Sequence, residues 1–346
     1  MIWAAAFLAA TLATASPAGR DCTPHDGLSF VCGPVGSEDI ARVPGTRWLI
    51  ASGLDLGGGG HLHLIDSRSE SASALQTGAL PAPGLSASCG GPPDPAKMST
   101  DGLTIRAGAG RRHMLYVANH GDRRAIEIYR VDARPDVPTA TWVGCAPMPA
   151  GTLPNAVAAL PGGRLIVTSF HDPDDKLAWA RMARREPTGS VWSWRPGAGF
   201  LRMSTGPISG ANGVEVSRDE RTLYVSAWSA RTLVVIDFHT GLRREIPLGF
   251  LPDNIKRARG GLLLVGGQRT TVESIANCTG AQCPQDWIVA RVDPRRGTVT
   301  PLVERRGDAL INYACTGLEV DGKLYITARG DKRIAWLPVS SLPSLR

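Results

Sequence analysis

The chain has 346 residues, 43% of them hydrophobic and 20% charged, and it contains 40 Gly and 26 Pro. This is the composition of an ordinary globular protein that is rich in turns and has enough apolar residues for a sizeable core. The net charge of +7 comes almost wholly from Arg and is spread thinly along the chain. A nucleic-acid binder needs a clustered basic face with interleaved aromatic residues, so the sequence argues against nucleic acid as a partner.

An apolar run opens the chain. Residues 2–15 end in the small-x-small sequence Ala13-Thr14-Ala15, which is typical of a secretory signal peptide. We therefore expect residues 1–18 to be a signal peptide and residues 19–346 to form an exported chain, periplasmic or secreted. The run lacks Lys and Arg, which leaves an uncleaved anchor or a mis-assigned start as alternatives. No later segment has the roughly 18 consecutive apolar residues that span a bilayer, so no transmembrane span is predicted in the mature chain.

Seven cysteines agree with export to an oxidising compartment, where disulfides persist. Two pairs are close enough in sequence to close small loops, namely Cys22 with Cys32 and Cys278 with Cys283. The remaining cysteines are Cys89, Cys145 and Cys315, and spacing alone does not give the connectivity. No spacing matches a zinc site, and we expect the odd cysteine to be buried and unreactive because no activating His lies beside it in the sequence.

Six segments of the chain share one pattern, built around a strongly apolar strand. The six copies of that strand are nearly identical and occupy residues 47–52, 114–119, 164–169, 222–227, 261–266 and 323–328. A short strand precedes each copy, and a third strand follows at residues 61–66, 125–130, 190–195, 232–237, 288–293 and 333–338. Six strand-rich units of about 50 residues predict an all-β fold, a six-bladed β-propeller that forms a single domain over residues 19–346.

The first strand of each repeat carries an oxygen-bearing side chain at one register position, two residues before an apolar anchor. The six residues are Glu38, Asp101, Asn155, Asn212, Asp253 and Thr316. The innermost strands of a propeller line its axis, so we expect these side chains, together with Asn254, to converge on the tunnel. Hard oxygen donors without an accompanying Cys or His suit a central Ca²⁺ site better than Zn²⁺ or Cu²⁺. The alternative is that each Asn or Asp before Gly is only a turn former.

The sequence also resembles a known family. The motifs that carry the resemblance are Gly36-Ser37-Glu38-Asp39-Ile40, Tyr116-Val117-Ala118-Asn119-His120, Leu153-Pro154-Asn155, Ala211-Asn212-Gly213-Val214 and Leu251-Pro252-Asp253-Asn254-Ile255. They look like the corresponding motifs of paraoxonases, which are calcium-dependent six-bladed-propeller arylesterases and lactonases. The motifs occur in the same order, although the loops between them differ. Wider relatives of that fold are gluconolactonase (senescence marker protein), diisopropyl fluorophosphatase and strictosidine synthase.

The resemblance implies roles for individual residues. It makes Ca²⁺ the expected cofactor, and the ligands of the catalytic ion would be Glu38, Asn155, Asn212, Asp253 and Asn254. It also places Asp39 and the backbone of Leu103 near a second, structural Ca²⁺. Ala156 stands where paraoxonases have an Asp ligand of that second ion, so we expect the second site to be weakened or absent.

The resemblance also points to a catalytic pair with one departure. His120 matches one histidine of the family's pair, whereas Asp101 stands in the place of the other. Either Asp101 orients His120 as the base that activates water, or Asp101 turns inward as a further calcium ligand and the chemistry is reduced, altered or lost. His120 could equally serve only as a hydrogen-bonding residue at a strand end.

Further residues are candidates for contact with substrate. His171 falls at the end of the third repeat's apolar strand, and Thr316 receives no ligand duty from the resemblance, so both are predicted to line the substrate site. The segment Asp172–Pro187 is the longest insertion within a blade and has apolar residues at helical spacing. We interpret it as a lid or as the cover of a blade edge.

Together these features favour an exported calcium-dependent hydrolase of esters, in particular of small lactones or aryl esters. In such an enzyme the ion polarises the carbonyl oxygen, and His120 or Asp101 accepts a proton from water. The alternative is a non-catalytic, calcium-bound propeller that binds a ligand or a partner. Other chemistry on the same scaffold, such as phosphotriester hydrolysis, is a third interpretation.

Overall fold

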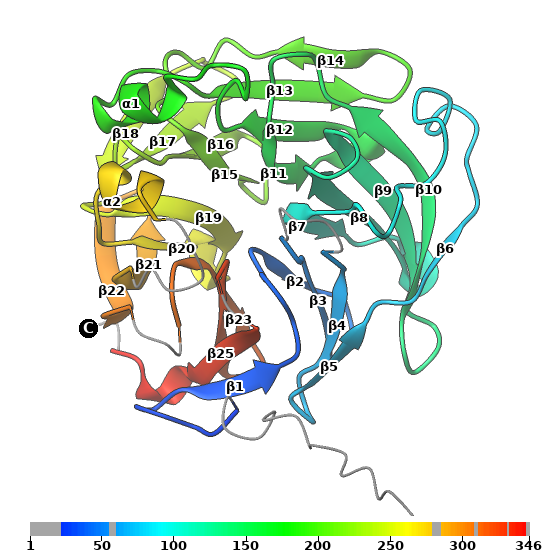
Figure 1. The fold of residues 1–346 in the computed structure, drawn as a ribbon, viewed down its shortest axis with the longest axis horizontal. Coiled ribbons are helices and arrows are strands. Elements are labelled where there is room, and N and C mark those ends of the chain that lie inside the picture. The colour runs from blue at the N-terminus through cyan, green and yellow to red at the C-terminus, as the bar shows by residue number, and fades with distance from the viewer. Residues whose placement is uncertain (1–21, 55–59, 279–284, 308–310, 331, 344–346) are drawn as a thin grey trace, which may run out of the picture.

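Six mostly antiparallel sheets stand around a central axis in the computed structural model, which describes residues 22–54, 60–278, 285–307, 311–330 and 332–343 (Figure 1). This arrangement confirms the predicted six-bladed β-propeller. The signal peptide predicted at residues 1–18 lies outside the described residues. Among the described residues the longest α-helix has six residues, and none is long and apolar enough to cross a membrane.

Blades 1 to 3 are built in chain order from the axis outwards. Blade 1 consists of β2 (Ile40–Arg42), β3 (Trp48–Ala51), β4 (His63–Asp66) and β5 (Ser71–Ala74). Blade 2 consists of β7 (Thr100–Arg106), β8 (Arg112–Asn119), β9 (Ala125–Asp132) and β10 (Thr139–Pro147), with β6 (Thr77–Ala79) parallel to β10 at its outer edge. Blade 3 consists of β11 (Pro154–Ala159), β12 (Leu165–Ser169), β13 (Ser190–Arg195) and β14 (Gly199–Arg202). The repeat pattern did not predict β6.

Blades 4 to 6 complete the ring. Blade 4 consists of β15 (Ala211–Val216), β16 (Thr222–Ala227), β17 (Thr232–Asp237) and β18 (Arg243–Pro247). Blade 5 consists of β19 (Leu251–Arg257), β20 (Leu263–Gln268), β21 (Trp287–Asp293) and β22 (Thr298–Arg305). Blade 6 consists of β23 (Ala314–Val320), β24 (Lys323–Ala328), β25 (Arg333–Pro338) and, as its outer strand, β1 (Ser29–Cys32). The described part of the chain also has four short 3₁₀ helices, at Ala109–Arg111, Pro161–Gly163, Arg259–Gly261 and Val339–Ser341.

The two ends of the described chain close the ring together. Strand β1 pairs antiparallel with β25, from Ser29 opposite Trp336 to Cys32 opposite Arg333. Blade 6 therefore takes strands from both ends of the chain, and opening the ring would require breaking this strand pairing. A disulfide between Cys22 and Cys32 ties the segment before β1 to that strand.

The core lies between neighbouring blades, and the second strand of each blade shows why. In β16, Leu223 and Val225 pack toward blade 3, whereas Tyr224 on the opposite face packs toward blade 5. Successive side chains of a strand point to opposite faces, so a strand with a blade on each side buries all of them. This explains the continuous apolar runs that reveal the repeats in the sequence.

The cysteines follow the predicted pattern in part. The Cys22–Cys32 disulfide is confirmed, and a second disulfide joins Cys89 to Cys145 in blade 2. Cys278 is disulfide-bonded, while its predicted partner, Cys283, lies outside the described residues. Cys315 is free and buried, as expected of the odd cysteine. Disulfides persist in oxidising compartments, so the bridges agree with an extracellular or periplasmic location.

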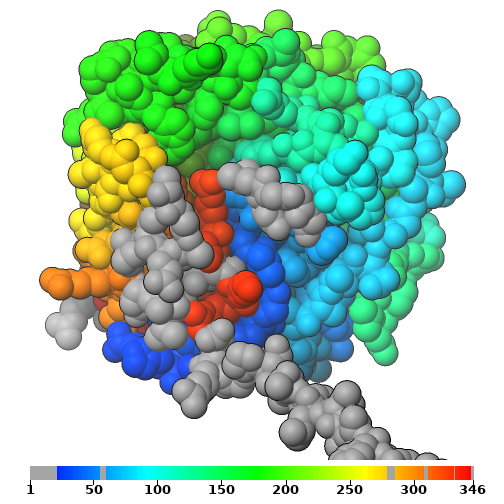
Figure 2. All heavy atoms as spheres, in the orientation of Figure 1, coloured from blue at the N-terminus to red at the C-terminus, as the bar shows by residue number. Residues whose placement is uncertain are grey.

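Two short α-helices lie on the face of the propeller where the second strands end. The predicted insertion Asp172–Pro187 contains α1 (Ala178–Ala183), and α2 (Val272–Ala276) follows β20. The two helices contact each other, and Figure 2 shows them side by side on this face, α1 in green and α2 in yellow. Met182 of α1 is fully buried in the same cluster as Trp228, so in this structure α1 is packed onto the propeller.

Candidate metal centre

The innermost strands carry β-bulges at the position of the predicted ring. In blade 2 the pairing of β7 with the second strand shifts its register between Thr100 and Leu103. The innermost strands of blades 3 to 5, which are β11, β15 and β19, shift register at the matching place. The bulged residues include Asp101, Asn155, Asn212 and Asp253. A bulge leaves residues unpaired and bends the strand, which re-aims their side chains. Blade 6 has a comparable shift between Ala314 and Thr316.

Glycine after the ring residue allows neighbouring innermost strands to approach closely. A Cβ added to Gly102 would lie 2.5 Å from the carbonyl oxygen of Asn155, and one added to Gly213 would lie 2.4 Å from that of Asp253. Any side chain at these positions would therefore push two blades apart. The Asn-Gly and Asp-Gly pairs thus lie within strands β7 and β15 and serve the packing of the ring, not the turns that the alternative interpretation assigned to them.

The structure brings the predicted ring residues together in the buried centre of the molecule. All of them are at most 9% exposed, namely Glu38, Asp101, Asn155, Asn212, Asp253, Asn254 and Thr316. Five of their side-chain oxygens are buried without a hydrogen-bond partner among the described residues: Glu38 Oε2, Asp101 Oδ1, Asn155 Oδ1, Asn212 Oδ1 and Asp253 Oδ1. Buried polar atoms are rarely left unpaired, so this group calls for a partner of its own.

Each of the three ring carboxylates has one satisfied and one unpaired oxygen. Asn254 Nδ2 donates to Glu38 Oε1 at 2.7 Å. Gln268 Nε2 donates to Asp253 Oδ2 at 2.8 Å. Asp101 Oδ2 is approached by the amide of Asn155 at 3.4 Å. The amide donors fix the carboxylates in orientation, and the second oxygen of each stays available.

The crowding of carboxylates makes ionisation of Glu38 and Asp253 less favourable. Burial, followed by the charges of Asp101 and Asp253, raises the pKa of Glu38 well above its usual range. Burial likewise raises the pKa of Asp253 to about 7, with Asp101 adding to the rise and the hydrogen bond from Gln268 opposing it. Clustered buried carboxylates are unfavourable unless a cation compensates them.

The donor set fits a hard divalent cation. The five unpaired atoms are carboxylate and amide oxygens, the ligands that Ca²⁺ takes in flexible sets of six to eight. Three carboxylates would more than balance the charge of such an ion. Glu38, Asn155, Asn212 and Asp253 each present a free oxygen, as the ligand prediction requires. Asn254 donates from Nδ2 to Glu38, so its ligand role, through Oδ1, stays a prediction. Asp101 offers the fifth unpaired oxygen.

One residue departs from the expectation that no cysteine accompanies the ring. The Sγ of Cys315 and carboxylate oxygens of Glu38 and Asp253 lie within 4.8 Å of one another. Burial, reinforced by those two carboxylates, raises the pKa of the Cys315 thiol well above its usual range, which favours the neutral thiol. A neutral thiol is a poor metal ligand because the thiolate is the form that binds metals.

His120 lies at the edge of the ring, against Asp101. Its Nε2 is 3.2 Å from Asp101 Oδ2 and also makes a short contact with the carbonyl oxygen of Pro154. Both neighbours are acceptors, so Nε2 is the nitrogen that carries the proton in the neutral ring. Among the described residues Nδ1 has no hydrogen-bond partner. The unprotonated Nδ1 is therefore the atom with which His120 can accept a proton.

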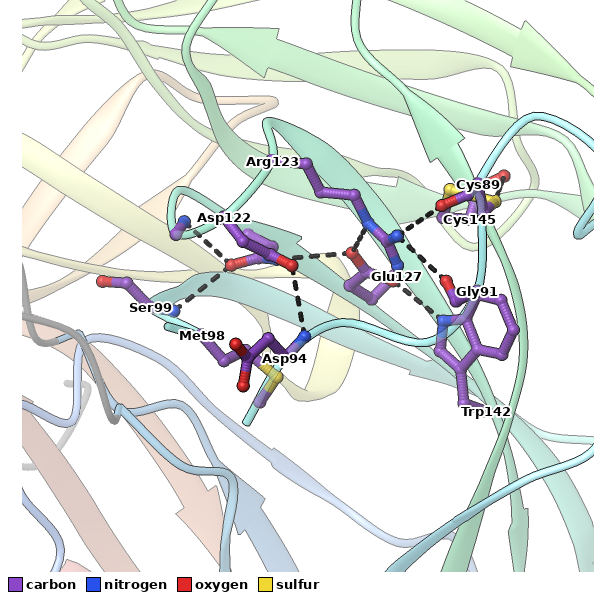
Figure 3. Close-up of polar contacts among 12 residues, drawn as sticks. Cys89, Gly91, Asp94, Met98, Ser99, Asp122, Arg123, Glu127, Trp142 and Cys145 are labelled. Carbon is purple, nitrogen blue, oxygen red and sulfur yellow. Dashed lines mark hydrogen bonds and ion pairs between the residues drawn. A yellow bond between two sulfur atoms is a disulfide. The ribbon is translucent and has the colours of Figure 1, made fainter. Parts of the chain in front are cut away.

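A buried polar network in blade 2 lies next to the turn that carries His120. Figure 3 shows Arg123, Glu127 and Trp142 pointing toward one another, beside the Cys89–Cys145 disulfide. Arg123 donates from Nε and Nη2 to the two carboxylate oxygens of Glu127 at 2.7 and 2.8 Å, and Trp142 Nε1 donates to Oε2 at 2.8 Å. Glu127 is fully buried, and these donors satisfy its charge.

Asn119 connects this network to His120. Its Nδ2 lies 3.3 Å from Glu127 Oε1, and its Oδ1 accepts hydrogen bonds from the backbone N–H groups of Ser99 and Gly121 at 3.2 and 3.0 Å. The backbone N–H of His120 donates to the carbonyl of Ser99 at 2.8 Å. The turn after β8 is thus held on both sides of His120, which limits how far the imidazole can move from Asp101.

The two predicted lining residues have different surroundings. The hydroxyl of Thr316 is fully buried and lies 3.0 Å from both the carbonyl of Glu38 and Oδ1 of Asp39. It therefore supports the backbone of a ring residue. His171 is half-buried, and its Nδ1 lies 2.8 Å from the carbonyl of Asp172. Its role toward a substrate stays a prediction.

An aromatic cluster stands next to the ring on the helix-bearing face. Phe170, Trp179 and Trp228 pack edge to face, with ring centroids 5.4 Å apart for Phe170 and Trp228 and 5.9 Å apart for Trp179 and Trp228. Trp228 Nε1 donates to Gln268 Oε1 at 3.1 Å, and Gln268 donates in turn to Asp253. The cluster is thereby linked through Gln268 to a ring carboxylate.

Equivalent backbone bonds place four residues at the same height around this face. Each of them directly follows the second strand of its blade. Its backbone N–H donates to the carbonyl oxygen of the residue that precedes the innermost strand of the same blade. The four residues are His120, Phe170, Trp228 and Arg329. Arg329 packs over the ring of Tyr313 at 5.8 Å. Burial opposes the charge of Arg329, whereas Tyr313, followed by Asp101 and Asp253, raises the pKa of Arg329, so a positive charge lies within electrostatic reach of the two carboxylates.

The residues of the predicted second calcium site surround a lysine. Lys256 Nζ lies 2.8 Å from Asp39 Oδ2 and 3.2 Å from the carbonyl oxygen of Leu103. Ala156, the other position of that site, offers no side-chain ligand. The contacts of Lys256, Gln268 and Cys315 were missed by sequence reasoning, since none of these residues shares a residue type with its counterparts in the other repeats. Arg329 was also missed, although Arg269 directly follows the second strand of blade 5 in the same way.

Solved structures provide counterparts of this fold. A gluconolactonase from Xanthomonas campestris is 22% identical, with 91% of this chain and 89% of that chain covered at a TM-score of 0.56. A luciferin-regenerating enzyme is 14% identical (92% and 98% covered, TM-score 0.57), and virginiamycin B lyase from Staphylococcus aureus is 13% identical (90% and 98% covered, TM-score 0.51). These similarities show the fold alone. The chain thus shares the six-bladed β-propeller fold with these proteins. No protein-family model and no curated protein matches the chain.

Proposed function

We propose that this protein is an exported, calcium-dependent hydrolase of small esters, with lactones or aryl esters as the substrate class. The observation that carries the proposal is the set of five buried, unpaired oxygens around the propeller axis, with a histidine at their edge. The paraoxonase-like motifs and the gluconolactonase among the similar structures support the same class of chemistry. Neither of them fixes the substrate.

Glu38, Asp101, Asn155, Asn212 and Asp253 would hold the ion through their free oxygens. A bound Ca²⁺ would supply Lewis-acid polarisation of the substrate carbonyl, a contribution of several kcal/mol. Asn254 and Gln268 keep two of the carboxylates in place by donating to the oxygens that face away from the free set. Orientation of this kind reduces the reorganisation needed when charge develops in the transition state.

His120 would act as the base toward water. Asp101 and the carbonyl of Pro154 hold the proton on Nε2, so the lone pair is on Nδ1. A proton taken up at Nδ1 creates an imidazolium that the Asp101 carboxylate stabilises. His120 can then return the proton to the departing alkoxide or phenoxide. General base catalysis of this kind contributes about 100- to 10,000-fold to a rate.

The aromatic cluster would bind the apolar part of the substrate. Phe170 and Trp179 are partly exposed and would face the substrate, whereas Trp228, at 1% exposed, packs against them from within. Aromatic pairs of this type add about 0.5–1.5 kcal/mol to area burial. An aryl or other apolar group suits this wall better than a charged one. This favours aryl esters or lactones with an apolar substituent.

Hydrolysis assays with controlled metal content test the proposal. The purified chain is assayed on a panel of lactones and aryl esters, first after chelation and then after calcium is restored. We expect turnover that disappears on chelation and returns with calcium. Calcium bound at a ratio of one ion per chain, without turnover on any member of the panel, would contradict the hydrolase.

A non-catalytic calcium-bound propeller is the second candidate, and one observation favours it. Asp101 occupies the place where the resemblance implies a catalytic histidine, and its free Oδ1 belongs to the same set as the proposed ligands. In that case Asp101 serves the ion, and His120 only holds Asp101 and Pro154 in place. Binding of apolar lactones without their hydrolysis would be the outcome that supports this function.

A further inference from the structure

We infer that the ammonium group of Lys256 is a built-in cation that takes the place of a second metal ion in the tunnel, so that no metal ion binds beside Asp39. The inference concerns the level of the tunnel next to the ring, around Asp39. It does not depend on the proposed hydrolysis.

The carboxylate of Asp39 contrasts with the ring carboxylates because both of its oxygens are satisfied. Oδ1 accepts from the N–H of Ile40 at 2.8 Å and lies 3.0 Å from the hydroxyl of Thr316. Oδ2 accepts from the N–H of Leu103 and from Lys256 Nζ, both at 2.8 Å. Asp39 is 2% exposed, so its charge needs a partner in the protein, and Lys256 supplies it.

Lys256 reaches this position from the opposite side of the ring. It lies on β19, two residues after Asn254 and just beyond the bulge of that strand. Its ammonium group meets Asp39 of blade 1 and the carbonyl of Leu103 in blade 2. One side chain of blade 5 therefore bridges to two other blades through charged or strongly polar contacts.

A metal ion does not fit here in addition to the lysine. An ammonium group already bonds to Asp39 Oδ2 and the Leu103 carbonyl, the two groups that the predicted second calcium site would have used. Ala156 contributes no oxygen ligand from its side chain. A divalent ion next to an ammonium would also leave excess positive charge around one carboxylate. The oxygens of Asp39 and Leu103 are therefore arranged to bind the ammonium group of Lys256.

The pair also bears on the proposed ligands above it. Thr316 lies 3.0 Å from both Asp39 Oδ1 and the carbonyl of Glu38, and Leu103 follows Asp101 by two residues. Lys256 thus acts as a positioning residue, through Asp39 and Leu103, for the segments that carry Glu38 and Asp101. It provides this support whether or not the ring holds an ion.

A double-mutant cycle in chelator tests the pair. The variants are Lys256→Met, Asp39→Asn and the double variant, with Lys97→Met as a control because Lys97 is 68% exposed. Loss of one partner of a buried ion pair leaves the other uncompensated, so we expect Lys256→Met to lower Tm by about 5–10 °C. The double variant should regain at least half of that loss, while Lys97→Met stays near the wild type.

The results that would overturn the inference are equally specific. They are a Lys256→Met protein as stable as the Lys97→Met control, or a double variant that loses the sum of the two single losses. If Lys256→Met does not fold, the double variant still tests the pair. A folded double variant would support the coupling of Lys256 and Asp39, whereas an unfolded one would show that the two buried residues contribute independently. Two calcium ions per wild-type chain would also overturn it. A chain without any bound calcium would contradict the proposed ring site only, because the cycle is run without metal.

Discussion

Asp101 joins the proposed metal ring to the proposed base: its Oδ2 lies 3.2 Å from Nε2 of His120, while its Oδ1 is buried without a partner among the described residues. One carboxylate thus has an oxygen available for a metal ion and another in contact with the proposed base. The two interpretations of the protein differ in which of these oxygens matters.

Substitution of Asp101 by Asn separates the two functions. Asn keeps an oxygen that can face the ring, but it no longer stabilises an imidazolium at His120. If the protein is a hydrolase, kcat on its best ester should fall about 100-fold, with a smaller loss of calcium affinity.

The companion variant Asp101→His restores the residue that the family resemblance implies. A gain of lactonase activity would mean that Asp101 weakens an inherited site, whereas a loss would show that Asp101 belongs to a working one. Asp132→Asn, at an exposed ion pair with Arg134, is a suitable control. If Asp101→Asn and the control have equal rates, the proposed role of His120 is contradicted.

Removal of the positive charge of Arg329 should tighten calcium binding. Arg329 lies within electrostatic reach of Asp101 and Asp253, so its guanidinium opposes a divalent cation held by those residues. In Arg329→Met we expect about fivefold tighter binding at low ionic strength, and less at high salt. Calorimetric titration of the chelated protein measures this change. Unchanged affinity would mean that the ion binds elsewhere, and the exposed Arg202 provides the matched control, Arg202→Met.

Cys315 offers a test of the metal's identity. Its thiol lies next to Glu38 and Asp253, and softer ions such as Zn²⁺ favour thiolate ligands whereas Ca²⁺ does not. We expect Cys315→Ser to bind calcium as the wild type does, within a factor of about two. Metal analysis of both proteins, prepared side by side, checks this. Loss of metal in the serine variant would point to a softer ion than calcium.

The stability of the fold should depend on pH through His63, away from the ring. Burial, followed by the charge of His61, lowers the pKa of His63 to about 4, and its Nε2 accepts from the N–H of Val35 at 3.3 Å. The unfolded chain takes up this proton near pH 6.5, whereas the folded chain does not until about pH 4. The contribution to stability is therefore present above pH 6.5 and is lost as the pH falls toward 4.

Denaturant unfolding at pH 7 and pH 5 measures this effect. Between pH 7 and pH 5 the free energy of unfolding of the wild type should fall by on the order of 2 kcal/mol through His63. The fall in His63→Gln should be smaller than that of the wild type by the same amount. The difference between the two proteins cancels the titration of all other groups. Parallel losses in both would show that His63 titrates normally in the folded chain.

The repeat pattern was sufficient to predict the propeller and the convergence of the ring. Asn155, Asn212 and Asp253 occur at one register position, and a shared bulge then gives them one orientation. Cross-blade partners were not predictable in this way. Gln268 reaches Asp253, and Lys256 reaches Asp39, only after the sheet has closed on itself, and no other repeat has a residue of the same type at these positions.

The same limit explains contacts that the sequence did not predict. Thr316 was predicted to line the substrate site because the resemblance gave it no ligand duty; its hydroxyl contacts Glu38 and Asp39, and its role toward a substrate stays a prediction. The place of Cys315 beside the ring was not predicted, because this residue precedes the register position by one, and the bulge of blade 6 brings its sulfur to the ring. Bulges depend on packing between blades, which the pattern of one repeat does not encode.

Calcium content of the wild type and of Glu38→Gln, measured after chelation and equilibration with excess calcium, tests the central claim most directly. Glu245→Gln, at a half-exposed ion pair with Arg243, serves as the matched control. The ring predicts one ion per chain in the wild type and the control, and binding weakened about 100-fold or more in Glu38→Gln, which loses a charged ligand in a buried site. A wild type without calcium, or a Glu38→Gln protein that binds it as tightly as the control, would contradict the metal centre.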